Sequence, residues 1–162
     1  MIITSKKIKQ FDFWSQNPCG NDSHNLAELM HHRYRHDSWI TKELDNIPRQ
    51  CKTYLEVGCG QGADSFYICK NLNQNAKYIA IDYSSESIKR AKGFVNNAKD
   101  NLNSKIYPDF SVGDALSLDF PDETFDFVYS LGVLHHTPNP QECINSIYRV
   151  LKKGGRAKIF LY

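Results

Sequence analysis

Short apolar segments and amphipathic segments alternate along the chain from residue 53 onward. Five stretches rich in apolar, β-branched and aromatic residues have the length of buried strands, and most of them end at a polar or glycine-containing turn. The predicted strands are Thr53–Val57, Tyr78–Ile81, Phe110–Val112, Phe125–Ser130 and Ala157–Tyr162.

Segments with the apolar spacing of a helix lie between most of these strands. One runs through about Leu72, one runs from Ser84 to about Asn97, and one begins at Pro140, a residue favoured in the first helical turn. We expect the pair Gly154-Gly155 to end this last helix. Strands that alternate with helices predict a parallel sheet with right-handed crossovers and helices on both faces.

Residues 1–50 differ in character, and we expect them to form an N-terminal cap on a domain that spans residues 51–162. They hold four of the six histidines, both tryptophans and the turn-forming run Asn17–Asp22. A helix is predicted from about Leu26 to Ile47. Its expected apolar contacts are Leu29, Ile40 and Leu44.

Length and composition narrow the classes of function. A chain of 162 residues is long enough for one domain with a core of its own, and its net charge of +2 argues against a protein built mainly to neutralise phosphates. No apolar run approaches the roughly 18 residues of a membrane span, and the first six residues lack the longer apolar stretch expected of a secretory signal. The five cysteines are scattered and never form Cys-x-x-Cys, so we expect reduced thiols in a cytoplasmic protein.

A glycine-rich turn follows the first predicted strand. In the run Glu56–Gly62, the glycines allow a tight turn, and the start of the next helix offers unpaired N–H groups to an anion. Asp82 ends the second strand 20 residues after Gly62, and an acid at that offset can bind both hydroxyls of a ribose. Together these features predict a nucleoside site. The alternative is that the glycines only make a tight connection and that Asp82 only caps a helix.

The spacing and the charge of this region separate two cofactor classes. A dinucleotide site has Gly-x-Gly-x-x-Gly, whereas this chain has Gly-x-Gly-x-Gly. Four carboxyl residues (Glu56, Asp64, Asp82 and Asp114) would repel a pyrophosphate, whereas they suit the net positive charge of S-adenosylmethionine. Asp64 is ambiguous, because an acid in the first turn of a helix also interacts favourably with the helix dipole.

In combination, these motifs resemble those of the class I S-adenosylmethionine-dependent methyltransferases. The similarity is closest to the type 11 branch, which includes the ubiquinone and menaquinone methyltransferases, and it covers residues 53–162 in order. The motifs are Leu55–Gly62, Asp82, Gly113–Ala115, Phe125–Ser130 with Leu134–His136, and Leu151–Arg156. The run from Phe13 to Tyr34 is similar to the N-terminal cap of some members.

The resemblance implies an α/β fold with a three-layer, Rossmann-like parallel sheet in the strand order 3-2-1-4-5. Complete domains of this class add two further strands, for which this chain has no residues after Tyr162. The fifth strand would then be an uncovered apolar edge. We expect this edge to be paired in a homodimer or with another partner, to be covered by the N-terminal segment, or to be bare because the chain is truncated.

The resemblance also implies which residues hold the cofactor. Glu56 and the glycine turn would hold the methionine end, Asp82 the ribose hydroxyls and Asp114 the adenine amino group, with Tyr83 and the Ala115 N–H beside the adenine. Backbone groups of Ser130 and Leu131 would complete the methionine pocket. The expected cofactor-binding residues are thus Glu56, Gly58, Cys59, Gly60, Gly62, Asp82, Tyr83, Asp114, Ala115, Ser130 and Leu131.

Several histidines and aromatic residues are candidates for further roles. His135 and His136 follow the fourth strand, where either could act as a general base, although ordering the loop or lining the cofactor pocket is the favoured interpretation. His32 and His36 are one helical turn apart, but no acidic or cysteine partner completes a site, so we expect no metal. A lid over the cofactor or substrate, or packing of the cap onto the body, would use Trp14, Arg33, Tyr34 and Trp39.

A small-molecule acceptor is predicted by elimination. The turn after the fourth strand lacks the Asp/Asn-Pro-Pro-aromatic motif of enzymes that methylate base amino groups, and no basic stripe with interleaved aromatic residues suggests RNA. We therefore expect no nucleic-acid and no membrane partner. The alternatives are a cofactor-binding module without turnover and, less favoured, a nicotinamide-dependent oxidoreductase.

Overall fold

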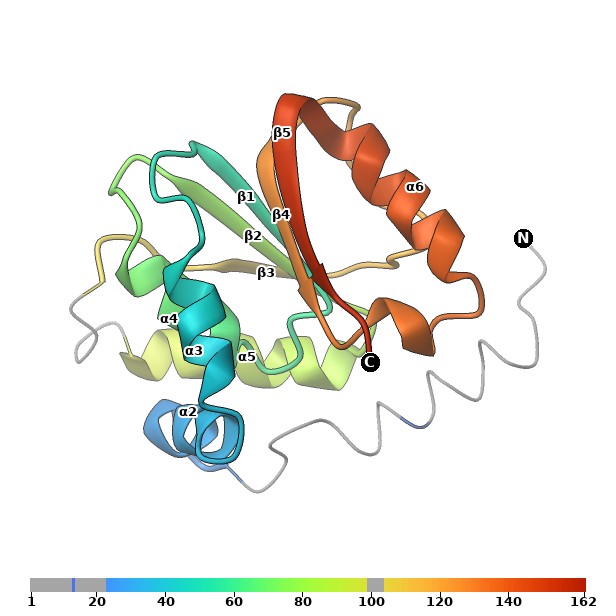
Figure 1. Cartoon of the computed structure of the whole chain (residues 1–162). Coiled ribbons are helices and arrows are strands. Elements are labelled where there is room, and N and C mark those ends of the chain that lie inside the picture. The colour runs from blue at the N-terminus through green and yellow to red at the C-terminus, as the bar shows by residue number, and fades with distance from the viewer. Residues whose placement is uncertain (1–12, 14–22, 99–103) are drawn as a thin grey trace.

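The computed structural model describes residue 13, residues 23–98 and residues 104–162 of the chain. Its centre is a five-stranded parallel sheet with the order β3-β2-β1-β4-β5 (Figure 1). The predicted order and the parallel arrangement are therefore confirmed. The strands are β1 (Thr53–Val57), β2 (Lys77–Asp82), β3 (Asp109–Val112), β4 (Phe125–Leu131) and β5 (Leu151–Phe160).

Helices cover both faces of the sheet, which confirms the predicted three layers. Alternate residues of β1 face opposite sides: Tyr54 belongs to the core under one set of helices, and Leu55 and Val57 belong to the core under α6. The first face carries α2 (Leu26–Tyr34), α3 (Trp39–Asp45), α4 (Ala63–Lys70) and α5 (Ser85–Ala98). The second face carries α6 (Pro140–Val150), preceded by the short 3-10 helix η1 (Leu134–His136).

The single helix predicted from Leu26 to Ile47 is wrong, because the structure has two helices there. The chain leaves the helix after Tyr34, and α3 starts again at Trp39 with Ser38 in the N-cap position. The Asp37 carbonyl accepts from the Ile40 N–H, and its carboxylate accepts from the Trp39 indole. Asp and Ser hydrogen-bond locally to the backbone and favour helix starts over helix interiors. The predicted apolar contacts Leu29, Ile40 and Leu44 are buried.

The prediction that Gly154-Gly155 ends the last helix is also wrong. That helix ends at Val150, and β5 begins at once with Leu151. Between the pairs Phe125–Leu151 and Phe127–Arg156 the register shifts, so extra residues of β5 form an irregularity in the strand. Gly154 has a φ of +77°, and a Cβ on Gly155 would lie 2.8 Å from the Lys152 carbonyl oxygen, which explains why glycines occupy these positions.

The N-terminal helices contact the last strand. The Lys158 ammonium donates to the Glu43 carbonyl oxygen at 2.7 Å and pairs with the Glu43 carboxylate, and the Trp39 ring packs against Phe160 with a centroid distance of 5.6 Å. On one face of the sheet, these side chains of β5 are thus covered by α3, whereas coverage of the strand edge by the N-terminal segment stays a prediction. Pairing of the strand edge in a homodimer stays a prediction.

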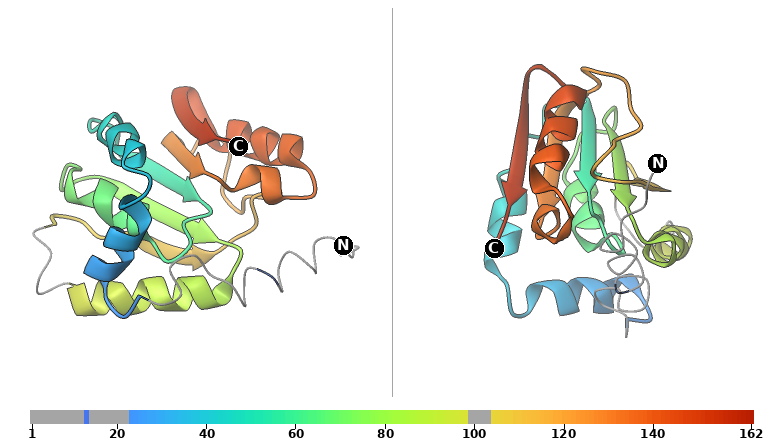
Figure 2. Two further views of the ribbon diagram at one scale, coloured as in Figure 1. Left: turned by 60° about the horizontal axis from the view of Figure 1, so that its bottom comes forward. Right: turned by 90° about the vertical axis from the view of Figure 1, so that its right-hand side faces the viewer.

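The position of α2 matters most for function. Figure 2 shows α2 lying across the carboxyl ends of the strands, where parallel α/β sheets bind their ligands. No helix within the described ranges is long and apolar enough to cross a membrane.

Candidate functional site

A cavity of about 390 Å³ lies at the carboxyl ends of the strands, between α2 and η1. This volume falls within the range of roughly 300–1,000 Å³ that is typical of small-molecule sites. Its walls come from the turn after β1, the ends of β2 and β4, the segment after β3, η1 with the residues after it, and α2. Each of these elements is distant from at least one of the others in sequence, so the sheet topology assembles the site.

The glycine turn forms one wall of the cavity. Gly58, Gly60 and Gly62 all have positive φ angles, of 81°, 53° and 90°. A Cβ on Gly58 would collide with Val133, whereas a Cβ on Gly60 would have no heavy atom within 4 Å. Gly60 therefore presents bare backbone to open space in the cavity, which allows a ligand to approach the main chain closely.

Asp82 ends β2 beside this turn. Its carboxylate accepts the Gly60 N–H at 2.8 Å through Oδ2 and the Ser84 N–H at 2.8 Å through Oδ1. Burial raises the pKa of Asp82, and these two backbone hydrogen bonds act in the opposite direction. Each carboxylate oxygen has two acceptor positions, so Asp82 keeps acceptor capacity for two hydroxyl groups of a ligand.

Two further predicted groups lie along the same wall. Tyr83 lines the cavity, as do Asp114 and Ala115 from the segment after β3. Asp114 holds its own turn in place, because Oδ1 accepts the Leu116 N–H at 3.0 Å. The adenine end predicted from the resemblance therefore has these three side chains within one cavity.

Glu56, in β1 just before the turn, is almost completely buried, with 3% of its surface exposed. Its Oε2 accepts hydrogen bonds from the Ser65 hydroxyl of α4 and, at 2.8 Å, from the Tyr78 hydroxyl of β2. Burial, together with the nearby charge of Asp64, raises the pKa of Glu56 from 4.5 to about 8. This shift favours the protonated form of the side chain, whereas the sequence predicted an ionised acid at this position.

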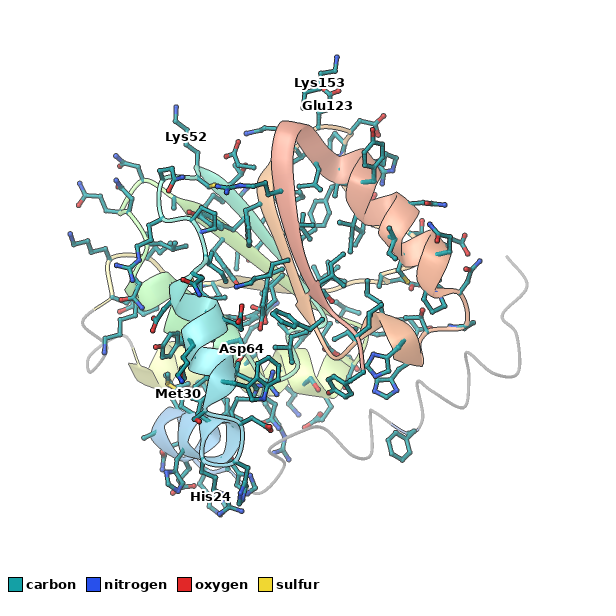
Figure 3. All side chains as sticks on the ribbon, viewed as in Figure 1. His24, Met30, Lys52, Asp64, Glu123 and Lys153 are labelled. Atoms are coloured by element: carbon teal, nitrogen blue, oxygen red, sulfur yellow. The ribbon has the colours of Figure 1, made fainter. Side chains whose placement is uncertain are left out.

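Asp64, which is labelled in Figure 3, lies in the first turn of α4. Its carboxylate is the centre of a hydrogen-bond network that the sequence did not predict. Arg33 of α2 donates from Nε to Oδ1 at 3.1 Å and from Nη2 to Oδ2 at 2.9 Å. The hydroxyls of Tyr34 and Tyr129 also donate to this carboxylate, at 3.0 Å and 3.1 Å. These four donors fill the four acceptor positions of the carboxylate.

The structure brings most of the predicted cofactor-binding residues together. Gly62 and Ser130 are the predicted residues that do not line the cavity: a Cβ on Gly62 would meet Phe110, and the Ser130 hydroxyl donates to the Val57 carbonyl oxygen. The predicted residues that do line the cavity are Glu56, Gly58, Cys59, Gly60, Asp82, Tyr83, Asp114, Ala115 and Leu131.

The two candidate histidines have different positions. His136 lines the cavity, whereas His135 does not and instead lies between His136 and Tyr162, with ring-centroid distances of 4.0 Å and 4.8 Å. Burial lowers the pKa of His136, and the charge of His135 lowers it further. Of the two, His136 is therefore the one placed to contact a ligand.

The predicted lid residues also separate. Arg33 lines the cavity, whereas Tyr34 packs on Tyr67 and Trp39 packs on Phe160. Trp14 lies outside the described residues. Within the described ranges, no group of three or more His, Cys, Asp or Glu side chains is placed to hold a metal ion.

Tyr129 and Tyr162 are cavity residues that the sequence reasoning missed. Tyr129 sits inside the apolar run of β4, where an aromatic residue is expected to be core, and only its hydroxyl reveals a second role. Tyr162 follows β5, and its side chain reaches the turn after β4, where a Cβ on Gly132 would lie 2.4 Å from the tyrosine oxygen. No local sequence signal indicates either contact.

Comparison with known proteins identifies the family. The methyltransferase domain family matches residues 55–159, from β1 to the end of β5. The chain belongs to this family. A sterol 24-C-methyltransferase of Pneumocystis carinii is 33% identical over 121 residues, which are 75% of this chain and 30% of that protein. An ajmaline N-methyltransferase of Rauvolfia serpentina is 34% identical over 110 residues, which are 68% of this chain and 36% of that protein.

A solved structure has the same fold. The SAM-dependent methyltransferase from Aquifex aeolicus superposes with a TM-score of 0.62 at 25% identity, covering 75% of this chain and 61% of that one. The aligned part of this chain covers about a third of the length of each of the two curated relatives. S-adenosylmethionine is the cofactor of this family.

The residues of the cavity fit this cofactor. Asp82 has acceptor capacity for the two ribose hydroxyls, and the open space at Gly60 lets a ligand contact the backbone. The site carries less negative charge than the sequence predicts, because Arg33 pairs with Asp64 and the pKa of Glu56 is raised. Of the four carboxyl groups that were expected to make an acidic site, two therefore differ from that expectation: Asp64 is paired with a cation, and the pKa of Glu56 is raised.

Proposed function

We propose that this methyltransferase domain binds S-adenosylmethionine in the cavity and transfers its methyl group to a small-molecule acceptor. The main support is that the open backbone at Gly60 and the Asp82 carboxylate meet in one cavity and are joined by a hydrogen bond. The names of the two curated relatives, a sterol methyltransferase and an alkaloid methyltransferase, support a small molecule as the acceptor. They differ in the acceptor atom, carbon in one and nitrogen in the other.

We assign the cofactor contacts as follows. Asp82 holds the ribose, while Tyr83, Asp114 and the Ala115 N–H hold the adenine. Glu56, Cys59 and the backbone of the glycine turn surround the methionine end, with Leu131 completing that part of the cavity. When bound, the cofactor supplies a methyl group that is already activated by a positively charged sulfur.

The protein's own contribution is mainly positioning. The cavity walls hold an acceptor beside the cofactor in the alignment that transfer requires and exclude water from the site. Where the acceptor is a hydroxyl, His136 is our candidate for the group that takes its proton. Its lowered pKa supports this role, because a neutral imidazole at neutral pH is able to accept a proton.

We also propose a cytoplasmic location. The cysteines in the described part of the chain, Cys51, Cys59, Cys69 and Cys143, are all free thiols, which supports a reducing compartment.

Asp82→Ala tests the ligand assignment. Charge-assisted hydrogen bonds contribute about 1.5–3 kcal/mol, so we expect the variant to bind S-adenosylhomocysteine about 10–100-fold more weakly by titration calorimetry. Asp119→Ala, which changes a residue outside the cavity lining, is the matched control and is expected to bind as the wild type does. Unchanged affinity of Asp82→Ala would show that the ribose lies elsewhere.

A ligand screen separates the classes of function. S-adenosylmethionine and S-adenosylhomocysteine should raise the melting temperature, and NAD(H) and NADP(H) should not. The reverse pattern would indicate an oxidoreductase. Binding without formation of S-adenosylhomocysteine, over a panel of hydroxyl, amine and carbon acceptors, would leave a binding module without turnover.

A further inference from the structure

We propose that Arg33 of α2 binds the carboxylate of the cofactor's methionine end and that Asp64 holds its guanidinium in position for this contact. The inference rests on the proposed function, since it names a residue for one end of the same ligand. It assigns a role in ligand recognition to the N-terminal helix, which lies outside the residues matched by the family.

Charge around the cavity is the first reason. Among the described residues that line the cavity, Arg33 is the only lysine or arginine. The ligand's carboxylate would otherwise enter a site that is lined by the carboxyl groups of Glu56 and Asp64. A buried anion without a cationic partner is unfavourable, so a bound carboxylate at this end requires a donor of this kind.

The hydrogen bonds of Arg33 are the second reason. Its Nε and Nη2 donate to the two oxygens of Asp64, which leaves the hydrogens of Nη1 for another acceptor. Within the described ranges, the hydrogen bonds of Arg33 use Nε and Nη2 and none of them uses Nη1. The side chain keeps 31% of its surface exposed although it is paired with a buried carboxylate, so the guanidinium is not enclosed by the protein.

Rigidity is the third reason. Asp64 is fixed by Tyr34 from α2 and Tyr129 from β4, so the two-point contact with Arg33 is held from three elements. Burial disfavours the charged form of Arg33, but the hydrogen bonds and charge of Asp64 outweigh burial and raise its pKa. The guanidinium is therefore charged and oriented before any ligand binds, which lowers the entropy lost on binding.

The position of the network points to the methionine end. Asp64 follows the glycine turn in the first turn of α4, and Arg33 is close enough to Glu56 to lower its pKa. Asp82, at the predicted ribose position, instead accepts the Gly60 N–H within the turn. Because all four acceptor positions of Asp64 are filled, this carboxylate positions Arg33 and does not itself take the ligand's ammonium group.

A simpler interpretation is that the Arg33–Asp64 pair only fastens α2 to α4. The two interpretations differ in their dependence on the ligand. A fastener affects every ligand of the cavity alike, whereas a carboxylate-binding group affects only ligands that have a carboxylate.

The experiment compares three probes by titration calorimetry. S-adenosylhomocysteine has both charged groups of the amino-acid end, its decarboxylated analogue keeps the ammonium, and methylthioadenosine has neither. For Arg33→Met we expect affinity for S-adenosylhomocysteine to fall about 10–100-fold, while affinity for the other two probes stays within about twofold of the wild type. Arg35→Met, a change at the exposed end of the same helix, is the control and should leave all three affinities unchanged.

Two further variants keep the result decisive. Tyr34→Phe removes one donor to Asp64 from the same helix but leaves Arg33, so it should not discriminate between the probes. If Arg33→Met does not fold, Arg33→Lys keeps a charge without the two-point geometry and is expected to show a smaller loss with the same ligand dependence. Equal losses for all three probes would overturn the inference in favour of the fastener. Absence of S-adenosylhomocysteine binding by the wild type would instead refute the proposed function.

Discussion

Two glycines of the same turn, Gly58 and Gly60, have positive φ angles but different surroundings. Gly58 faces Val133 so closely that a Cβ would lie 2.3 Å from one of the valine's methyl carbons. Packing within the protein therefore excludes a side chain at this position. Gly60 faces the cavity, and its N–H is held by Asp82. The first glycine therefore serves packing, and the second serves the approach of a ligand to the backbone.

Alanine substitutions at these two positions should separate stability from binding. Gly60→Ala adds a methyl group without a protein neighbour, so we expect only the strain of a positive φ, about 1–2 kcal/mol, but a loss of S-adenosylhomocysteine affinity of at least about 10-fold. Gly58→Ala adds the collision with Val133 and should lower the melting temperature further. Thermal unfolding and calorimetry on both variants check this. Wild-type affinity in Gly60→Ala would mean that no ligand approaches this backbone.

At the scale of elements, one carboxylate joins the starts of three strands. Asp126 of β4 accepts through Oδ2 from the N–H groups of Lys52 and Thr53 and from the Thr53 hydroxyl, each at 2.9 Å. Through Oδ1 it accepts from the Lys152 ammonium of β5 at 2.9 Å. Burial raises the pKa of Asp126, but the hydrogen bonds from Lys152, Thr53 and Lys52 outweigh it, so the net pKa is well below the usual range.

Asp126→Asn is expected to lower the free energy of unfolding by about 1.5–3 kcal/mol, because an amide nitrogen would face donors and the charge that pairs with Lys152 would be lost. Denaturant unfolding measures the difference. Asp122→Asn is the matched control: its carboxylate pairs with Arg149 at 2.8 Å but is 74% exposed, so a loss of less than about 1 kcal/mol is expected. Similar losses in the two variants would show that Asp126 does not join the strands.

The two wrong predictions of elements have different physical causes, one local and one non-local. The helix break after Tyr34 depends on local hydrogen bonds of Asp37 that compete with an otherwise helical spacing of apolar residues. The start of β5 at Leu151 depends on pairing with Phe125, a contact that the sequence of the segment alone does not reveal. The strands that follow the alternation of apolar and turn residues were predicted within one or two residues of their ends, apart from this start of β5.

At the scale of the whole molecule, the sequence located the cavity but not its charge. The glycine turn and Asp82 are local signals, and both were predicted to form the site. The pairing of Asp64 with Arg33 joins residues that are 31 positions apart, and Tyr129 reaches the same carboxylate from 65 positions away. Such contacts arise only when α2, α4 and β4 pack together. The expected acidic site is therefore less acidic than the count of carboxyl residues predicts.

The raised pKa of Glu56 also makes the stability of the whole domain depend on pH. Because its pKa is raised in the folded state from 4.5 to about 8, the folded protein keeps a proton that the unfolded chain releases between these values. Unfolding thus releases a proton in this window, and linkage requires the contribution of Glu56 to stability to be complete below about pH 4.5 and to decrease as the pH rises to about 8. For a group fully protonated when folded and ionised when unfolded, the decrease is about 1.4 kcal/mol per pH unit.

Glu56→Gln should remove this dependence, because an amide keeps an acceptor for Ser65 and Tyr78 without ionising. We expect the free energy of unfolding of the wild type, measured with denaturant across this window, to fall with rising pH more steeply than that of the variant. Histidines titrate in the same range, but they are present in both proteins, so the difference between the two curves isolates Glu56. Glu86→Gln, on α5 with a side chain that is 44% exposed, should follow the wild-type curve. Parallel curves for the wild type and Glu56→Gln would show that the buried carboxyl group is ionised in the folded protein, and the charge of the methionine end would then have to be reassigned.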